Sequence, residues 1–343
     1  MQKRLSSGNL LNEKGHLAQA GYSTELVRKY DRTQIKAGKM RIKEWDYYLV
    51  YNSQFAVALT VADNGYMGML SASVIDFENK KEKTSSIIEL LTMGKYHMPQ
   101  TSKKGDVVVK NNQGQFSFIH EKEKRKLLVE YPKFDGEKSL KVDLVLEDEP
   151  AENMVIATPF KDKPKAFYYN QKIVGFTAYG RVQYGDQEII FDKKNTQAIL
   201  DWGRGVWTYK NTWYWSSMAG TMNGHRIGFN LGYGFGDTSN ASENMVFYDG
   251  YATKLADIKF EIPKDKKGRN DYLQPWKVTS ADGSLELSFA PIINRHSDIN
   301  LLILRSNQNQ VFGKFSGTIK LKDGQVVEIR EMLGFAECVF NKW

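Results

Sequence analysis

Residues 201–215 read Asp-Trp-Gly-Arg-Gly-Val-Trp-Thr-Tyr-Lys-Asn-Thr-Trp-Tyr-Trp and hold four of the seven tryptophans of this 343-residue chain. The carboxyl group of Asp201, the guanidinium group of Arg204 and two glycines lie among the indoles. Random placement rarely gathers these residue types so closely. The stretch therefore marks where a site is expected, although it does not name the ligand.

Short strand-like segments separated by turn residues dominate the rest of the chain. Apolar and polar residues alternate within them, the period of a half-buried strand, and Asp63-Asn64-Gly65 is a strong turn signal because Asn and Gly accept positive φ. Strands are predicted over residues 47–62 (two strands meeting near Asn52), 65–77, 107–109, 115–119, 127–131, 140–146, 180–184, 188–191, 317–321 and 325–329. Residues 86–93 and 196–202 have helical periodicity. The chain is predicted to be an all-β, mainly antiparallel protein with a few short helices.

The chain also contains two weak internal repeats. Trp45 and Trp213, 168 residues apart, are each followed two positions later by another aromatic residue. Residues 180–192 resemble residues 317–329, at an offset of 137, and with one residue fewer in the second copy after this match Asp201 and Trp207 fall opposite Glu337 and Trp343, at an offset of 136. The unequal offsets predict an insertion in the first copy, within residues 78–125.

The repeats predict two domains. Residues 1–207 form the first, with an N-terminal extension and the insertion, and residues 208–343 form the second. The tryptophan-rich stretch is then the joint between them, and such joints are common ligand sites. Because no Pro/Ser-rich linker occurs there, we expect the two domains to be joined rigidly.

Several segments carry a resemblance to a known family. They are residues 43–48, 201–205, 228–237, 243–244 and 334–337. These segments resemble the bacterial domain-of-unknown-function family 2804, which is itself more distantly similar to tandem lipocalin-like proteins: the AttH group, carotenoid 1,2-hydratases and tocopherol cyclases. The resemblance implies two tandem lipocalin-like, calycin-type antiparallel β barrels. The distant relatives protonate an alkene in an apolar barrel, which implies an acid-assisted lyase, hydratase or cyclase; no catalytic residues are transferred.

Asp201 is the first candidate for chemistry. Asp201 and Arg204 lie three residues apart and would pair on one turn of a helix. If the neighbouring tryptophans partly desolvate Asp201, its pKa is raised and it serves as a general acid. The alternative, which we favour, is a structural salt bridge that fixes the joint. The presence of Glu337 at the matching place of the second copy supports that structural role.

The aromatic residues of the stretch are candidates for ligand binding. The predicted ligand-binding residues are Trp202, Arg204, Trp207, Tyr209, Trp213 and Trp215. Trp213 and Trp215 alternate onto one face of a strand and would line an apolar or cation-stabilising pocket, since aromatic faces attract carbocations and sugars. Tyr209 is also a candidate proton relay. Packing in an ordinary core explains the tryptophans equally well.

Residues 228–237 contain glycine at alternate positions 232, 234 and 236. No helical pattern or β-α-β unit surrounds them, which excludes a nucleotide-binding loop. The pattern predicts a curved strand with one bare face that leaves room for a ligand. Asn230 is a predicted ligand-binding residue, and Asp237 or Glu243, with His225 as partner, is a candidate proton donor. The alternative for Asp237 is capping of the loop that follows.

Composition restricts the partners. The net charge is +8, but residues 1–207 hold 32 basic and 26 acidic side chains and residues 208–343 hold 16 and 14, so nucleic acid is not expected as a partner. No apolar run reaches the ~18 residues of a membrane helix, and residues 1–6 lack a signal-peptide core. A peripheral contact with an anionic membrane surface stays open.

The single cysteine, Cys338, excludes an intrachain disulfide and predicts a cytoplasmic location. No metal-ligand spacing, Walker loop or Gly-x-Ser-x-Gly elbow occurs, so neither a metal nor a cofactor is predicted.

We expect the protein to bind a small apolar or amphipathic molecule, lipid- or isoprenoid-like, in the second barrel or at the joint. Acid-assisted lyase, hydratase or cyclase chemistry extends this expectation, and a buried acid with a raised pKa would favour it. A non-enzymatic lipid carrier or sensor, whose acids all face water, is one alternative. A carbohydrate-active protein, with two carboxylates roughly 5–10 Å apart across an open groove, is another.

Overall fold

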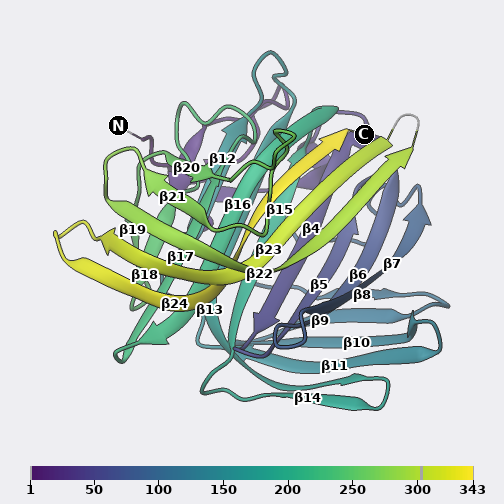
Figure 1. Cartoon of the computed structure of the whole chain (residues 1–343). Coiled ribbons are helices and arrows are strands. Elements are labelled where there is room, and N and C mark those ends of the chain that lie inside the picture. Colours follow the sequence, from purple (N-terminus) through teal and green to yellow (C-terminus); the bar gives the residue numbers. More distant parts are fainter. Residues whose placement is uncertain (1, 302–303, 343) are drawn as a thin grey trace.

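The computed structural model describes residues 2–301 and 304–342, which form two large antiparallel sheets (Figure 1). The first sheet contains β2 (Gly21–Ser23), β4 (Ile42–Tyr51), β5 (Phe55–Asp63), β6 (Met67–Asp76), β7 (Lys81–Leu90), β8 (Val107–Lys110), β9 (Gln115–Glu121), β10 (Lys124–Asp135), β11 (Lys138–Glu147), β12 (Met154–Pro159), β13 (Phe167–Tyr184), β14 (Gln187–Phe191) and β15 (Gln197–Val206). The second contains β16 (Lys210–Met222), β17 (His225–Tyr233), β18 (Met245–Tyr248), β19 (Tyr251–Lys254), β20 (Ile258–Glu261), β21 (Trp276–Ser280), β22 (Leu285–Leu301), β23 (Leu304–Lys320) and β24 (Val326–Lys342). β1 (Gly8–Asn9) and β3 (Arg28–Lys29) form a small parallel pair.

The prediction of an all-β, antiparallel chain is confirmed, and the helices are two 3₁₀ turns, η1 (Arg32–Gln34) and η2 (Lys39–Arg41). The predicted turns lie where the sequence indicates. The Asn52 side-chain oxygen accepts hydrogen bonds from the backbone N–H groups of Gln54 and Phe55 and so closes the β4–β5 turn. Gly65 has φ +79° in the turn between β5 and β6.

The two helical segments predicted from the sequence are wrong. Residues 86–93 lie largely in β7, and residues 196–202 lie almost entirely in β15. Ile87 of β7 is buried whereas Ile88 and Leu90 are exposed, so apolar residues on both faces imitate a helical period. β15 lies between β13 and β4 with both faces covered, and a strand buried on both faces loses its alternation.

Three hydrophobic cores stabilise the two sheets. One lies within the curl of the first sheet, one within the curl of the second, and the third between the two sheets. Successive side chains of a strand point to opposite faces. Leu200 and Trp202 of β15 therefore enter the first core, whereas Ile199 enters the core between the sheets.

The sheets change at the tryptophan-rich stretch. β15 ends at Val206 and β16 begins at Lys210, next to the predicted boundary between residues 207 and 208. Figure 1 shows the strands of the second sheet, green to yellow, lying across those of the first. The division of the chain into domains 1–207 and 208–343 stays a prediction. The N-terminal segment also contacts the second part, since the backbone N–H of Lys3 donates to the carbonyl of Asn240.

Strand pairing reproduces both repeat offsets. Tyr47 of β4 pairs with Asp201 of β15, and Trp215 of β16 pairs with Glu337 of β24. Tyr47 and Trp215 are 168 residues apart, and Asp201 and Glu337 are 136 residues apart. The same strand pair, with the same register, is therefore formed once in each sheet. Trp343, which the repeat places opposite Trp207, lies outside the described residues.

Two glycines occupy matching places in the two copies. Gly180 has φ +133°, and a Cβ atom there would lie 2.2 Å from the carbonyl oxygen of Asp143. Gly317 has φ +143°, and its Cβ atom would lie 2.2 Å from the carbonyl oxygen of Glu286. Both positions require glycine because the conformation is unfavourable for other residues and the partner strand leaves no space.

Gly180→Ala and Gly317→Ala are each expected to lower the free energy of unfolding by roughly 1–3 kcal/mol, because the added methyl group collides with the facing strand. Urea denaturation measures the effect. Gly38→Ala is the control: Gly38 has φ −59° and open space around it, so a change within about 0.5 kcal/mol is expected. Either repeat variant matching this control would contradict the prediction.

Candidate functional site

The candidate site lies in the interface between the two sheets and is built on one row of residues from each. In the first sheet, cross-strand pairing aligns Tyr47 of β4, Asp201 of β15 and Lys172 of β13. In the second sheet, it aligns Trp215 of β16, Glu337 of β24 and Gln310 of β23. Residues directly opposite each other in paired strands point to the same face. Each row therefore presents its side chains to the other sheet.

The two rows contact each other through Lys172 and Gln310. The Lys172 ammonium group lies 2.8 Å from a carboxylate oxygen of Asp201 and 3.8 Å from the centre of the Trp215 ring. Gln310 donates from Nε2 to the hydroxyl oxygen of Tyr47 at 3.2 Å. A residue from each sheet thus reaches into the row of the other, which fixes the relative position of the rows.

Glu337 is a buried acid of the site with a raised pKa. Its side chain is 8% exposed. Trp213 Nε1 donates to one carboxyl oxygen at 2.8 Å and Gln310 Nε2 to the other at 3.2 Å. Burial raises the pKa of Glu337 to about 7. The Trp213 hydrogen bond and the positive charges of Lys172 and Arg295 lower this pKa, but by less than burial raises it. Near neutral pH this carboxyl group can therefore both hold and release a proton.

Glu243 is a second acid at the site. Its carboxyl group lies over Gly232, where a Cβ atom would be 2.7 Å from Glu243 Cδ. Asn230 donates from Nδ2 to the carbonyl oxygen of Glu243 at 2.9 Å, and its own oxygen accepts from Trp215 Nε1 at 2.7 Å. Burial raises the pKa of Glu243, and the positive charge of Lys172 opposes this shift. The bare face predicted for the glycine-rich strand thus makes room for a carboxyl group.

Asn170 of β13 contributes an uncompensated acceptor. Its Nδ2 donates to Asp201 Oδ1 at 2.6 Å and to the carbonyl of Trp202 at 2.9 Å, which fixes the orientation of the amide. Its oxygen is buried and has no hydrogen-bond partner among residues 2–301 and 304–342. Buried polar atoms are normally paired, so this oxygen suits a donor that is not part of the protein.

An aromatic wall continues from Glu337 towards solvent. It consists of Trp45, Tyr168, Trp207, Trp213 and Phe235. The Phe235 ring lies 4.7 Å from Trp207, 4.8 Å from Tyr168 and 5.5 Å from Trp213. The three indoles are half-buried. Gly203 makes room for Trp45, because a Cβ atom at this position would lie 1.9 Å from the indole.

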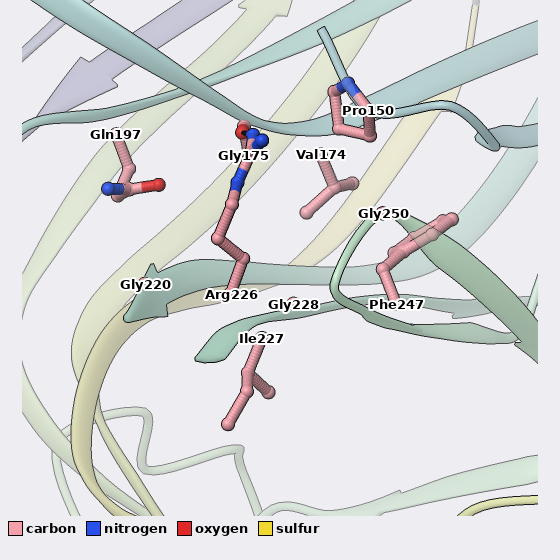
Figure 2. A pocket seen from close by; sticks show the side chains of 10 residues that line it. All are labelled: Pro150, Val174, Gly175, Gln197, Gly220, Arg226, Ile227, Gly228, Phe247 and Gly250. Atoms are coloured by element: carbon pink, nitrogen blue, oxygen red, sulfur yellow. Dashed lines mark hydrogen bonds between the residues drawn. The ribbon is translucent and has the colours of Figure 1, made fainter. Parts of the chain in front are cut away.

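The other end of the interface contains a crevice of about 10 Å³ (Figure 2). It is lined by Pro150, Val174, Gly175, Gln197, Gly220, Arg226, Ile227, Gly228, Phe247 and Gly250. Figure 2 shows the Arg226 side chain reaching from β17 to Gly175 of β13, where it donates to the backbone carbonyl. The crevice has room for about one water molecule.

One known protein family matches almost the whole chain. The family described as "Domain of unknown function (DUF2804)" matches residues 2–343. The chain belongs to this family. Residues 201–205, which first indicated it, are the segment of β15 that carries Asp201 and Gly203 into the interface.

Solved structures share the fold of this family member. A crystal structure of an AttH protein from Nitrosomonas europaea is 12% identical and has a TM-score of 0.55, over 92% of this chain and 98% of that chain. A crystal structure of CghA with Sch210972 is 9% identical and has a TM-score of 0.53, over 98% of this chain and 97% of that one. No curated protein matches the chain. At such identity the comparisons establish the lipocalin-like fold alone.

The predicted pair between Asp201 and Arg204 is wrong. Both residues lie on β15, and residues three apart in a strand point to opposite faces. Asp201 pairs with Lys172, whereas Arg204 enters the first core and binds Asp46 at 3.0 Å. Trp202 is also buried there, with the Arg204 guanidinium 4.3 Å from its ring centre. Trp202 and Arg204 thus face away from the candidate site.

Three other predicted residues also lie apart from the carboxyl groups of the interface. His225 is exposed on β17, and its ring pairs with Asp249 at 2.7 Å, not with Asp237 or Glu243. The Asp237 carboxylate accepts from the Ser239 backbone N–H at 3.0 Å, as the loop-capping alternative predicts, and this bond lowers its pKa. Tyr209 is 52% exposed.

The structure adds residues that the sequence did not place in the site. The sequence indicates Glu337 only as the counterpart of Asp201 and does not predict a place in the site for Lys172, Gln310 or Tyr47. The repeat leads to Glu337 only together with the pairing of Tyr47 and Asp201, because the two offsets then place Glu337 beside Trp215. No local signal identifies Lys172, which reaches Asp201 only through the β13–β15 pairing.

Glu337→Gln is expected to stabilise the chain at pH 8 by about 3 kcal/mol at most. This is the free energy that corresponds to raising the pKa of Glu337 from 4.5 to about 7. The folded chain binds this proton more tightly than the unfolded chain. The protonated Glu337 carboxyl group therefore makes its full contribution to the free energy of unfolding below about pH 4.5, and this contribution is lost as the pH rises through about 7. Urea denaturation at pH 5 and pH 8 measures it, with the exposed Glu286→Gln as control. A gain that is equal at both pH values would contradict the assignment.

Trp213→Phe is expected to move the Glu337 titration above pH 7, because it keeps a ring in the aromatic wall but removes the N–H that stabilises the carboxylate. The ¹³C shift of the Glu337 carboxyl, identified by its loss in Glu337→Gln, measures the midpoint. Trp45→Phe, which changes a ring of the same wall that forms no hydrogen bond to Glu337 among the described residues, should leave the midpoint in place. A lower midpoint in Trp213→Phe would show that the indole does not stabilise the anion.

Proposed function

We propose that the interface between the sheets is the catalytic centre of a proton-transfer enzyme acting on a small apolar or amphipathic molecule. The observation that carries this proposal is Glu337, a buried carboxyl group whose pKa is raised to about 7 at the foot of the aromatic wall. Ionisable groups with such pKa values are frequent in active sites. Burial between two sheets also favours a small molecule over a polysaccharide in an open groove.

The chemistry follows from the groups around Glu337. The protonated carboxyl group donates its proton to one carbon of a C=C bond, which leaves positive charge on the neighbouring carbon. Indole faces attract such a cation, and the ion-paired Asp201 carboxylate lies in the same interface. The cation then either binds water, which gives up a proton to a carboxylate, or loses a neighbouring proton. The first course is hydration and the second is isomerisation. If a second C=C bond of the same molecule attacks the cation before a proton is lost, a ring bond forms and the reaction is cyclisation.

Asn170 supports the course that uses water. Its oxygen needs a hydrogen-bond donor, and its nitrogen is fixed on Asp201. A water molecule or a hydroxyl group of the substrate would supply that donor. The same arrangement run backwards would remove water from an alcohol. Hydration or dehydration is therefore the reaction type that these residues support best.

A carrier or sensor is the alternative that the test must separate from an enzyme. Binding an apolar molecule requires no buried acid, and burying an ionisable group costs free energy. Glu337 and Glu243, whose pKa values are raised by burial, are therefore better explained by proton transfer. A carrier would return its ligand chemically unchanged.

The test is incubation of the protein in D₂O with an apolar metabolite extract from the cell that makes it. We expect one compound to gain a deuteron or the elements of D₂O, as measured by mass spectrometry. Glu337→Gln should abolish the exchange, and Glu286→Gln should retain it. A compound that binds but remains unlabelled would identify a carrier, and labelling by Glu337→Gln would assign the proton to another group.

A further inference from the structure

The two halves of the interface are related residue by residue. Strand pairing makes Tyr47 equivalent to Trp215 and Asp201 equivalent to Glu337. The third members of the rows are the residues that pair with the two acids from the next strand. They are Lys172, opposite Asp201, and Gln310, opposite Glu337.

Contacts between the rows are reciprocal. Gln310 of the second sheet binds Tyr47 of the first at 3.2 Å, and Lys172 of the first packs on Trp215 of the second at 3.8 Å. Each contact joins the third member of one row to the first member of the other. The two first members, Tyr47 and Trp215, also meet, with ring centres 6.0 Å apart. Such reciprocity is the pattern of a two-fold interface.

The equivalence ends at the third member of each row. Lys172 is a cation and forms an ion pair with Asp201 at 2.8 Å. Gln310 is neutral and donates an amide hydrogen bond to Glu337 at 3.2 Å. An opposite charge within about 4–6 Å favours the charged form of a carboxyl group, whereas a neutral amide does so far less. The two equivalent acids thus differ in the charge of one neighbour.

We propose that Lys172 and Gln310 are the positioning residues that divide the work between the two equivalent acids, so that Asp201 is the anion and Glu337 the proton donor of one site. This inference rests on the proposed function of the interface and adds the source of its asymmetry. Pairs of acids whose surroundings separate their protonation states are typical of acid–base catalysis. The substrate class that follows is an alkene or alcohol whose reaction develops positive charge beside Asp201.

Other charged and titratable groups face Glu337 from the elements packed around it. They are Lys172, Asp201, Tyr47 and Tyr168 from the first sheet and Arg295 from the second, whereas Cys338, the next residue of β24, points to the opposite face. Both cations are engaged elsewhere: Lys172 binds Asp201, and Arg295 donates to the Ser73 hydroxyl at 2.7 Å. Within residues 2–301 and 304–342, Glu337 forms no ion pair. Gln310 is therefore the neighbour whose replacement can supply one.

The test exchanges the third members and follows the titration of the acids by carboxyl ¹³C NMR. In Gln310→Lys the Glu337 midpoint should fall from about 7 into the range of an exposed glutamate, and deuterium exchange should fall at least tenfold. In Gln310→Met, which is similar in size but uncharged, the midpoint should stay at about 7 or rise. A merely structural role for Gln310 would not give opposite effects in these two variants.

A single variant that does not fold gives no titration. The double variant Lys172→Gln/Gln310→Lys keeps the net charge of the interface and provides a second measurement. In this double variant, as in Gln310→Lys, the Glu337 midpoint should fall from about 7 into the range of an exposed glutamate. If Glu337 still titrates near pH 7 in Gln310→Lys and in the double variant, the inference is overturned. A different result would contradict the proposed function: wild-type protein in which Glu337 titrates near pH 7 but which catalyses no deuterium exchange.

Discussion

The ion pair between Lys172 and Asp201 constrains how the two sheets meet. Both charges lie inside the interface, where desolvation is costly unless each charge has its partner and its remaining hydrogen bonds. Asn170 supplies one of these bonds, and the Trp215 ring covers the ammonium group. Removing one partner of such a pair typically costs roughly 3–5 kcal/mol, a large fraction of the stability of a domain. The second sheet therefore has to place an indole, not a charge, over Lys172.

The remaining features of the site follow from that placement. With Trp215 over Lys172, cross-strand pairing brings Glu337 into the same buried face, at a position with no counter-ion of its own. Its carboxyl group is then held by neutral donors, Trp213 and Gln310, and burial decides its protonation. Gly203 and Gly232 have no side chains on this face, which leaves space for Trp45 and Glu243.

Much of the fold could be predicted from the sequence because turn chemistry is local. Asp63-Asn64-Gly65 and the alternating segments predict β4 to β6 and β8 to β11. β7 and β15 were predicted as helices because their apolar residues occupy both faces, and only the neighbouring strands explain that pattern. The site was predictable in position but not in composition. Trp207, Trp213 and Trp215 marked the interface, whereas Lys172 and Gln310 reach it through strand pairing that no local pattern encodes.

The reciprocal contacts between the rows have an evolutionary consequence. A homodimer built from one half of this chain would carry the same residue at both third positions, either two lysines or two glutamines. Both acids would then be ionised, or both would be protonated, and neither state pairs a donor with an anion. Joining two copies in one polypeptide lets each mutate alone. Covalent fusion of duplicated halves is thus the step that lets the two third positions differ, which the proposed division of roles between Asp201 and Glu337 requires.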